Sequence, residues 1–414
     1  MQGLIGPLKE LAEFEELCKN KKKDVGMIRV CGCVNSQKSH MMYALGDGCK
    51  YKVIACSSET KAKQIYEEYR FLDSNTYLYP AKDFLFYQAD IRSKELVKQR
   101  MEGIQAVLSG EPVTVVTSLD GFMDHLAPKE SIAEKVLKVQ NDSVLKLDEM
   151  AEKLSVIGYD REVQVEGSGQ FAVRGGILDI YPLTEELPVR IELWGDEVDS
   201  IRTFDVESQR SIENLMDIVI YPAVEFPQNG EKGVSFLDYF PPEDTILFLD
   251  EPVRLVERGQ NIEDEFMEAQ KKRLESGYDL EEEEAKIFPV TEILKKINCY
   301  SSIGFYALGM KCKGLEVRES YEIQAKSVNP YNNSFEMLTQ DLKRLKRNGY
   351  RVILLSGSRT RAKRLAEDLR DYNLSSYYSE DLDREVKPGE IMTAYGYIAE
   401  GYEYPMLKFT VIAE

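Results

Sequence analysis

The sequence has two histidines, one tryptophan and no Cys-x-x-Cys pair. A Ser-His-Asp or Cys-His arrangement would have to use His40 or His125, and neither lies near an elbow motif, so hydrolase chemistry of that kind is disfavoured. Cys31 and Cys33 have no partners at zinc-ligand spacing, so we expect no metal site. The number of cysteines is odd and they lie in apolar contexts, as expected of reduced thiols. They are Cys18, Cys31, Cys33, Cys49, Cys56, Cys299 and Cys312.

Long apolar runs are also absent, and basic side chains are outnumbered by acidic ones. No run approaches the ~18 residues that a bilayer span needs. The first residues lack the basic and apolar regions of an export signal, so we expect a soluble, cytoplasmic protein. With 53 basic and 72 acidic side chains, the net charge is −19. Such a chain is repelled by DNA, RNA and anionic lipid unless a local patch intervenes.

The 414 residues are enough for two to four domains. From residue 27 the pattern alternates between strands and helices, which predicts a parallel sheet. After Pro128 it changes to short strands with tight turns. An apolar strand typical of a parallel sheet appears again at residues 245–250. We therefore expect an α+β module inserted into an α/β domain.

Four other segments carry expectations. An apolar stripe predicts a docking helix over 8–18, and a long helix over about 253–285 ends in four glutamates, Glu281 to Glu284, that form a solvated face. Residues 318–333 have the composition of a linker. A last β-α-β unit follows and stops on a strand at 409–414, so we expect the chain to be a piece of something longer.

The run from Gly32 to Ser39 follows a strand and opens a helix, as a phosphate-binding P-loop requires. It fits G-x-x-x-x-G-K-[ST] except at Gln37, which replaces the second glycine. A side chain there obstructs the close approach of phosphates. Lys38 and Ser39 could still supply charge and a magnesium ligand, but a relic βα turn is the favoured interpretation.

A second half-motif, Asp250 and Glu251, stands at the end of an apolar strand. Asp250 could hold magnesium and Glu251 could polarise water. Equally, carboxylates at a helix N-terminus are favoured by the helix dipole alone. The chain shows no identifiable arginine finger.

The turn from Ser356 to Ser358 is the weakest candidate for a phosphate site. We interpret it as an N-terminal cap of the following helix. The cations of that helix's first turns are expected to be solvated; they are Arg359, Arg361, Lys363 and Arg364.

In the inserted module, strand alternation places Arg190 and Trp194 on one face and Ile191 on the other. Trp and Arg are enriched in binding hot spots, and Arg174 on a neighbouring strand could join them. In the alternative, Trp194 covers a sheet edge and Arg190 pairs with Glu192 or Asp179. The residues leave both open.

Two long runs resemble a known family: VEGSGQFAVRGGILDIYP at 165–182 and VRIELWGDEVDSIRTFD at 189–205, followed by SQRS at 208–211. Together with 79–83, 95–100 and 389–414, they make the chain similar to the transcription-repair coupling factor (Mfd) family and, more distantly, to UvrB. The resemblance implies an α/β fold with a split RecA-like, P-loop NTPase-like domain. Its parts would be 1–130 and 224–325, around an α+β UvrA-interaction domain at 131–223, with a small α/β third domain at 331–414.

The resemblance also implies a function. The UvrA-contacting arginines of the family fall on Arg174 and Arg190, and the aromatic contact falls on Trp194, where phenylalanine is usual. The expected function is recruitment of UvrA to stalled RNA polymerase, without ATPase or motor activity in this chain and without a cofactor. RNA polymerase and DNA would be reached only through parent domains absent here, the parent being an ATP-dependent DNA translocase.

Two alternatives from the enzyme class remain. The first is an ATP-dependent nucleic-acid remodeller that uses Lys38, Ser39, Asp250 and Glu251. The second, a sugar or nucleotide enzyme, rests on fold analogy alone. There is also no long aromatic hairpin between 80 and 120, so we do not expect damage verification.

Overall fold

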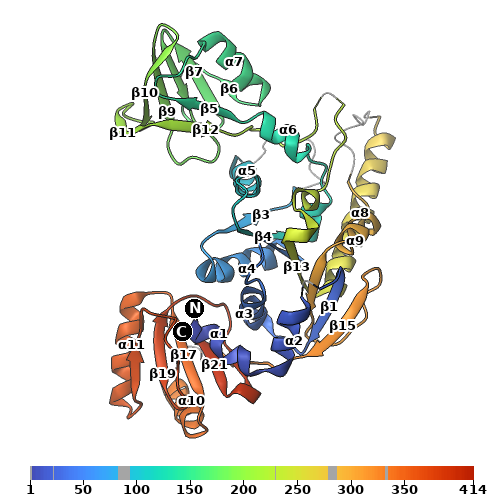
Figure 1. Ribbon diagram of the computed structural model, residues 1–414, viewed down its shortest axis with the longest axis vertical. Helices are drawn as coiled ribbons and strands as arrows, with labels where there is room; N and C mark the ends of the chain where they lie inside the picture. The colour runs from blue at the N-terminus through green and yellow to red at the C-terminus, as the bar shows by residue number, and fades with distance from the viewer. Residues whose placement is uncertain (1, 22, 83–93, 229, 278–286, 332–333) are drawn as a thin grey trace.

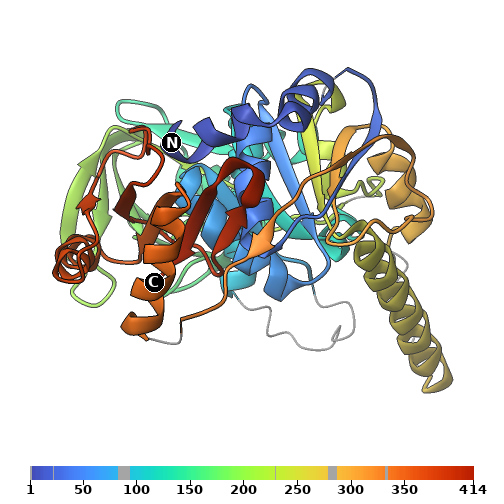
Figure 2. The same cartoon turned by 90° about the horizontal axis from the view of Figure 1, so that it is seen from below.

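The computed structural model describes residues 2–21, 23–82, 94–228, 230–277, 287–331 and 334–414. Three lobes follow one another along the long axis of Figure 1, with the inserted module at the top, a large parallel sheet in the middle and the last β-α-β unit at the bottom. The predicted α/β class with an insertion is confirmed. In Figure 2 the long helix α8 projects from the middle lobe. Over the described ranges, no helix is long and apolar enough to cross a membrane.

The middle lobe is one seven-stranded sheet in the order β15-β1-β14-β13-β2-β4-β3, with every pair parallel. The chain leaves the sheet after β4 and returns at β13. Its elements before the insertion are α1 Gln2–Ile5, η1 Gly6–Glu10, α2 Ala12–Asn20, β1 Gly26–Cys31, α3 Asn35–Leu45, β2 Tyr51–Cys56, α4 Glu59–Leu72, β3 Thr76–Tyr79, α5 Lys94–Leu108, β4 Val113–Ser118 and η2 Leu119–Phe122. Those after it are η3 Phe236–Tyr239, η4 Pro242–Asp244, β13 Thr245–Asp250, α8 Pro252–Glu275, α9 Val290–Ile297, β14 Ser301–Phe305 and β15 Val317–Glu322.

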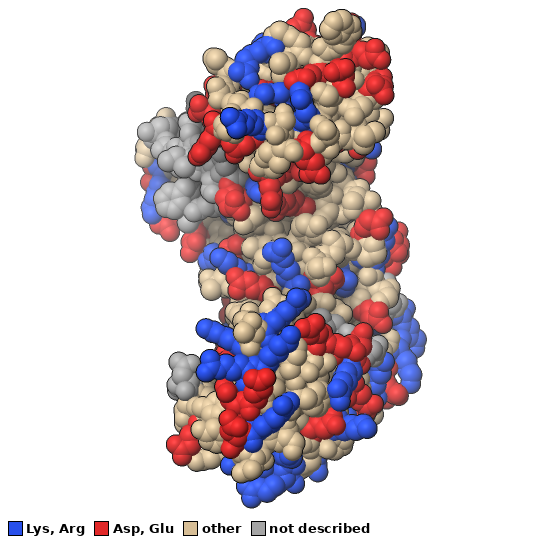
Figure 3. Space-filling view, turned by 90° about the vertical axis from the view of Figure 1, so that its left-hand side faces the viewer, with Lys and Arg blue, Asp and Glu red and all other residues tan. Residues whose placement is uncertain are grey.

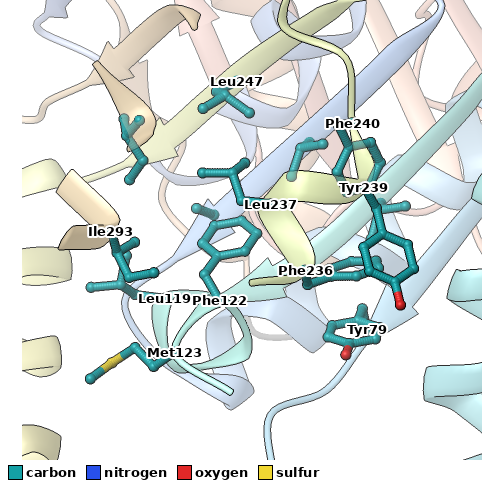
Figure 4. Packing of buried hydrophobic residues seen from close by; sticks show 14 of the residues in the cluster. Tyr79, Leu119, Phe122, Met123, Phe236, Leu237, Tyr239, Phe240, Leu247 and Ile293 are labelled. Carbon is teal, nitrogen blue, oxygen red and sulfur yellow. The ribbon is translucent and has the colours of Figure 1, made fainter. Parts of the chain in front are cut away.

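The centre of this sheet is buried on both faces. Every residue of β4 and β13 is buried, as near-continuous apolar strands of a parallel sheet require. On one face, the segment returning from the insertion packs into the core: Phe236 stacks on Tyr79 with ring centroids 3.7 Å apart (Figure 4). The two parts of the split domain therefore share one hydrophobic core.

The inserted lobe holds a six-stranded sheet in the order β11-β10-β9-β8-β7-β6, antiparallel except for the β6–β7 pair, and a two-stranded sheet of β12 and β5. Helix α7 buries Met150 and Leu154 against the larger sheet. The elements are α6 Lys129–Glu134, β5 Leu137–Gln140, α7 Leu147–Val156, β6 Asp160–Arg161, β7 Gln170–Arg174, β8 Ile177–Ile180, β9 Val189–Trp194, β10 Glu197–Phe204, β11 Ser211–Leu215 and β12 Asp217–Ile220.

The bottom lobe has a six-stranded sheet in the order β16-β20-β21-β17-β19-β18. Strands β21, β17, β19 and β18 run parallel, and β20 pairs antiparallel with β21 and β16. The elements are β16 Lys326–Ser327, α10 Phe335–Arg347, β17 Arg351–Ser356, α11 Arg359–Asp371, β18 Ser376–Tyr378, β19 Ile391–Tyr395, β20 Tyr402–Tyr404, η5 Pro405–Leu407 and β21 Phe409–Ala413.

The bottom and middle lobes share a core as well. Ile353, Tyr404 and Phe409 of the bottom lobe belong to the same buried cluster as Ile28 and Met41 of the middle lobe. Apolar burial therefore holds these two lobes together. The space-filling view in Figure 3 shows basic and acidic side chains interspersed over all three lobes.

The predicted linker over 318–333 is wrong in its first part. Residues Val317–Glu322 form strand β15, which pairs in parallel with β1 at the edge of the large sheet. An edge strand with polar side chains resembles a linker in composition, because only one of its sides is covered. Backbone pairing with β1, which the composition does not report, decides the structure.

Two predicted helices have different limits from those expected. The helix predicted over 8–18 is divided at Leu11 into η1 and α2, yet Leu8, Phe14 and Leu17 are buried in the core as expected. Helix α8 is described as far as Glu275, and the four glutamates from Glu281 lie outside the described residues. The division of the chain into the segments 1–130, 131–223, 224–325 and 331–414 stays a prediction.

Candidate functional site

The P-loop-like turn and the acidic half-motif meet at one edge of the large sheet. Strands β1 and β13 are separated by β14 alone, and carboxyl ends of parallel strands lie on one edge. Gly32 has a φ of 76°, and a Cβ there would lie 2.2 Å from the carbonyl oxygen of Ile323. The glycine is thus required by the neighbouring chain segment and its backbone conformation, without reference to a phosphate.

Lys38 is committed to two carboxylates of the chain. Its Nζ lies 2.7 Å from Asp250 Oδ1 and 2.6 Å from Glu251 Oε1, and Lys38 and Asp250 are both buried. Burial lowers the pKa of Lys38, but attraction to Asp250 and Glu251 outweighs it and the pKa is raised. The cation that would meet a phosphate is neutralised inside the protein.

The hydroxyl of Ser39 is also engaged in a hydrogen bond within the chain. The hydroxyls of Ser36 and Ser39 donate to the two oxygens of Glu68, at 2.6 and 2.5 Å, and Glu68 is buried. The bottom lobe adds to this group, since the N–H of Ala399 donates to Glu68 Oε1 at 3.1 Å and that of Glu400 to Ser36 Oγ at 3.0 Å. A carboxylate of the chain therefore receives the hydroxyl groups at the start of α3.

Gln37 connects the same turn to the bottom lobe. Its amide Nε2 donates to the Tyr404 hydroxyl at 3.0 Å, and its Oε1 accepts from the Val34 N–H at 3.2 Å. Gln37 is completely buried. The structure thus brings the residues of both half-motifs together and pairs their polar groups within the chain.

His40, one turn further along α3, makes the contact between these lobes sensitive to pH. It lies 3.1 Å from the Tyr404 hydroxyl and 3.0 Å from the Leu4 carbonyl oxygen. Complete burial lowers the pKa of His40 to about 4. Because this is below the unfolded value of about 6.5, the contribution to stability is full above pH 6.5 and is lost as the pH falls toward 4.

We expect the free energy of unfolding to fall by about 2 kcal/mol from this group between pH 6.5 and 5, at about 1.36 kcal/mol per unit. Urea titrations at several pH values measure it. A His40→Gln variant, which has no titrating ring, should be less stable at pH 7 but lose less over the same interval. Equal slopes for the two proteins would contradict the assignment to His40.

The second candidate site lies on the inserted sheet, where Trp194 ends β9. Trp194 is 84% exposed, whereas Ile191 is completely buried beneath the same strand. The strand therefore turns its apolar side inward and the indole outward, as alternation predicts. Trp194 is the cross-strand partner of Glu197 in β10. Glu197 also forms an isolated backbone β-bridge with Val144, which is exposed.

The two arginines of this site converge on one buried carboxylate. Arg190 Nε and Nη2 donate to Asp179 Oδ1 and Oδ2 at 2.7 and 2.9 Å, and Arg174 Nη2 donates to Oδ2 at 2.6 Å. Asp179 is 1% exposed. Hydrogen bonding to Asp179 raises the pKa of Arg190. Both guanidinium groups are thereby held on one outer face.

The environment of Arg190 is more closed than that of Arg174. Its guanidinium also donates to Gln209 Oε1 at 2.9 Å and lies 4.5 Å from the centre of the Phe204 ring. The Arg190 side chain is 15% exposed and that of Arg174 46%. The Asp179 pairing weighed from the sequence is therefore present alongside the exposed Trp194, and Glu192 pairs with Arg202 instead.

Sequence reasoning missed three contributors. Glu68 and Tyr404 come from segments far from the P-loop-like turn, and no local pattern announces them. Gln209, with a φ of 56°, stands in a tight turn before β11. The SQRS run at 208–211, which carries part of the family resemblance, was the available signal for Gln209. Among the described residues, no cluster of His, Cys, Asp and Glu could hold a metal ion.

Fold and sites together define an α/β protein whose large parallel sheet is interrupted by an inserted, mostly antiparallel domain. Residues 137–226 match the family described as "UvrB interaction domain". The chain is 25% identical to a transcription-repair-coupling factor of Bacillus subtilis, over 98% of this chain and 39% of the relative. It is 24% identical to the factor of Staphylococcus haemolyticus, over 82% of this chain and 33% of the relative. The predicted resemblance to the N-terminal region of these factors is confirmed.

The chain spans 39% of the length of the first of these relatives. Among solved structures it is similar to a hypothetical ATP-dependent RNA helicase from Sulfolobus tokodaii, with 10% identity and a TM-score of 0.27 over 95% of this chain and 82% of that chain. The fold class follows from the strand order of the large sheet, β15-β1-β14-β13-β2-β4-β3.

Proposed function

We propose that this chain is the docking module through which a transcription-repair coupling factor recruits UvrA to a stalled RNA polymerase in the cytoplasm. Arg174, Arg190 and Trp194 form the docking surface. The observation that carries the proposal is the 84% exposure of Trp194 on the same face as two arginines held by Asp179. Contacts with RNA polymerase and with duplex DNA are left to the remaining length of the parent protein, which we expect to be an ATP-dependent DNA translocase.

The arrangement of the surface supports binding with little ordering cost. Both arginines are already fixed on Asp179 by hydrogen bonds of 2.6 to 2.9 Å, so less side-chain freedom is lost on docking. An indole that is exposed in the free protein gains most when a partner covers it. Tryptophan and arginine are also the residues that most often dominate the binding energy of an interface.

The contacts of Lys38 and Ser39 favour this adaptor over the nucleotide-driven alternative. A nucleotide would have to displace Asp250 and Glu251 from Lys38 and Glu68 from Ser39. Each displaced carboxylate would remain close to the incoming phosphates and repel them. We therefore propose that this chain has no ATPase activity of its own and needs no cofactor.

A titration of UvrA with the 414-residue chain tests the proposal. Replacing Arg190 by alanine should weaken binding by about 2 kcal/mol or more, which is roughly 30-fold. Trp194→Ala should have an effect of similar size and, because the indole is exposed, should leave the unfolding transition unchanged. Arg161→Ala, on the exposed edge strand β6 of the same sheet, is the matched control. Unchanged affinity for both Arg190→Ala and Trp194→Ala would refute the docking surface.

A further inference from the structure

The carboxyl ends of the parallel strands of the bottom lobe form a sheet edge that lies outside the proposed docking surface. Strands β17 and β19 finish there with Ser356 and Tyr395, which are register partners. In open α/β sheets, ligands bind outside the carboxyl ends of the strands. Helix α11 begins at Arg359, three residues after β17 ends. The edge thus combines strand ends with the N-terminus of a 13-residue helix.

Strand β17 ends in Ser356, whose hydroxyl is buried. Its side chain is 1% exposed, and within the described part of the chain its Oγ makes no hydrogen bond. The alternation of β17 places Ser356 with Val352 and Leu354, whose cluster includes Leu365 and Leu369 of α11. The hydroxyl therefore points to the sheet face that α11 covers, next to the first turn of the helix. An unsatisfied buried donor is costly and needs an explanation.

The first turn of α11 also lacks the groups that normally complete a helix start. Ser358 occupies the N-cap position as expected, but its side chain makes no capping hydrogen bond, which corrects the cap predicted from the sequence. No acidic residue stands in the first turn. Four cations stand in the first six residues instead: Arg359, Arg361, Lys363 and Arg364. Positive side chains oppose the helix dipole here unless an anion joins them.

Two of these four cations make ion pairs within the chain: Lys363 lies 3.4 Å from Glu380, and Arg364 lies 3.7 Å from Asp368. The other two are available to a ligand. Over the described residues, neither Arg359 nor Arg361 is in an ion pair, and both are exposed. In Figure 3, basic side chains gather on the bottom lobe toward its boundary with the middle lobe.

Exposed aromatic rings accompany the cations. The Arg359 guanidinium lies 5.6 Å from the centre of the Tyr395 ring. Tyr395 and Tyr397 are 45% and 44% exposed. Phe71 of α4 meets the edge of the Tyr395 ring, with centroids 6.2 Å apart, and so supports it from the middle lobe. Cations interleaved with aromatic faces are characteristic of surfaces that bind single-stranded nucleic acid.

We propose that this edge binds a single-stranded nucleic acid. One phosphate meets the free N–H groups of the first turn of α11 and the Ser356 hydroxyl. Arg359 and Arg361 neutralise the adjoining backbone, and bases stack on Tyr395 and Tyr397. Acidic residues lie beside the cations and limit the extent of the positive surface: Glu380 pairs with Lys363 at 3.4 Å, and the Glu414 N–H bonds to the Leu355 carbonyl oxygen, next to Ser356. Exposed rings that can stack on unpaired bases suit one strand better than a duplex or an anionic membrane.

Fluorescence anisotropy with a labelled oligothymidylate of roughly 16 nucleotides and the 414-residue chain tests this proposal at about 50 mM salt. Arg359→Ala/Arg361→Ala should weaken binding tenfold or more and make the slope of log K against log salt shallower by about 1.4, at about 0.7 per phosphate contact. The matched control, Lys343→Ala/Arg347→Ala, removes the same charge from the exposed face of α10 and should change affinity less than twofold.

Ser356→Ala separates the site from general charge. It removes an unpartnered hydroxyl, so the unfolding transition should not move to lower denaturant, whereas oligonucleotide affinity should fall by roughly tenfold. Absence of binding, or equal losses in the α10 control, would overturn the proposal. So would tighter binding of a duplex of the same length, or complete displacement by millimolar inorganic phosphate, because either would show a different ligand class.

Discussion

Replacing Lys38 by methionine is expected to lower the free energy of unfolding by about 3–5 kcal/mol, because one side of a buried ion pair is removed. In the variant, Asp250 and Glu251 would face each other without their shared cation. Asp250 is 2% exposed and cannot be rehydrated without local opening. In a working P-loop the same lysine meets the phosphates of the nucleotide, so its loss would act on binding and leave the fold intact.

Urea unfolding of the wild type and Lys38→Met measures this difference, with Lys63→Met on the exposed face of α4 as control. The control should change stability by less than about 0.5 kcal/mol. Replacing Asp250 by asparagine in the Lys38→Met background should recover part of the loss, because the two side chains are coupled. Calorimetry with ATP and magnesium should show no saturable heat for the wild type. Micromolar binding that Lys38→Met abolishes without loss of stability would favour the nucleotide-driven alternative.

Replacing Arg100 by methionine is the second large expected effect, again about 3–5 kcal/mol of unfolding free energy. Arg100 is completely buried and donates to Glu225 at 2.7 and 2.9 Å, to Asp124 at 2.7 Å and to the Pro80 carbonyl at 2.8 Å. Its guanidinium lies 4.3 Å from the centre of the Tyr79 ring. Glu225 lies in the segment that leads back from the inserted lobe to the middle lobe. Its hydrogen bonds to Arg100 therefore hold this segment against helix α5.

The acid limb of the stability profile provides an independent readout of Arg100. Burial alone would raise the pKa of Glu225, but Arg100 and Lys82 outweigh it and lower the pKa to about 2. The stability from this shift is present above the unfolded value of about 4.3 and is lost as the pH falls toward 2. Arg100→Met should reduce that acid dependence.

Arg70→Met, at an exposed arginine whose guanidinium contacts Tyr66, controls for loss of a guanidinium and should change stability by less than about 0.5 kcal/mol. An unchanged unfolding midpoint for Arg100→Met would show that Lys82 and water suffice for the two carboxylates. The expected order of stability is therefore wild type, then Arg70→Met close behind, then Arg100→Met well below both.

Much of the fold follows from local pattern. Alternation of apolar strands and amphipathic helices predicts the parallel sheets. The change after Pro128 to short strands with tight turns predicts the insertion. The strand at 317–322 was missed because an edge strand carries polar residues, so local composition does not separate it from a linker. The helix predicted over 8–18 was divided at Leu11, although the buried positions of Leu8 and Leu17 were right.

The candidate sites divide in a similar way. Period-two alternation is a property of the strand itself, so the outward position of Trp194 was within reach of the sequence. The convergence of Arg174 and Arg190 on Asp179 needed the register of three strands, which sets which side chains are neighbours. The sequence kept the pairing with Asp179 and the exposure of Trp194 as alternatives, whereas the structure has both.

By itself, the sequence determined the class of fold, the inserted module, the absence of a complete P-loop at Gln37 and the outward face of β9. Each of these depends on residues adjacent in the chain, whose conformations are limited by local sterics and periodicity. Only the tertiary structure decided that Glu68 and Tyr404 occupy the polar groups at the start of α3, and that the hydroxyl of Ser356 has no partner among the described residues. These outcomes depend on groups separated by up to 367 residues, and only packing brings such groups within hydrogen-bond distance.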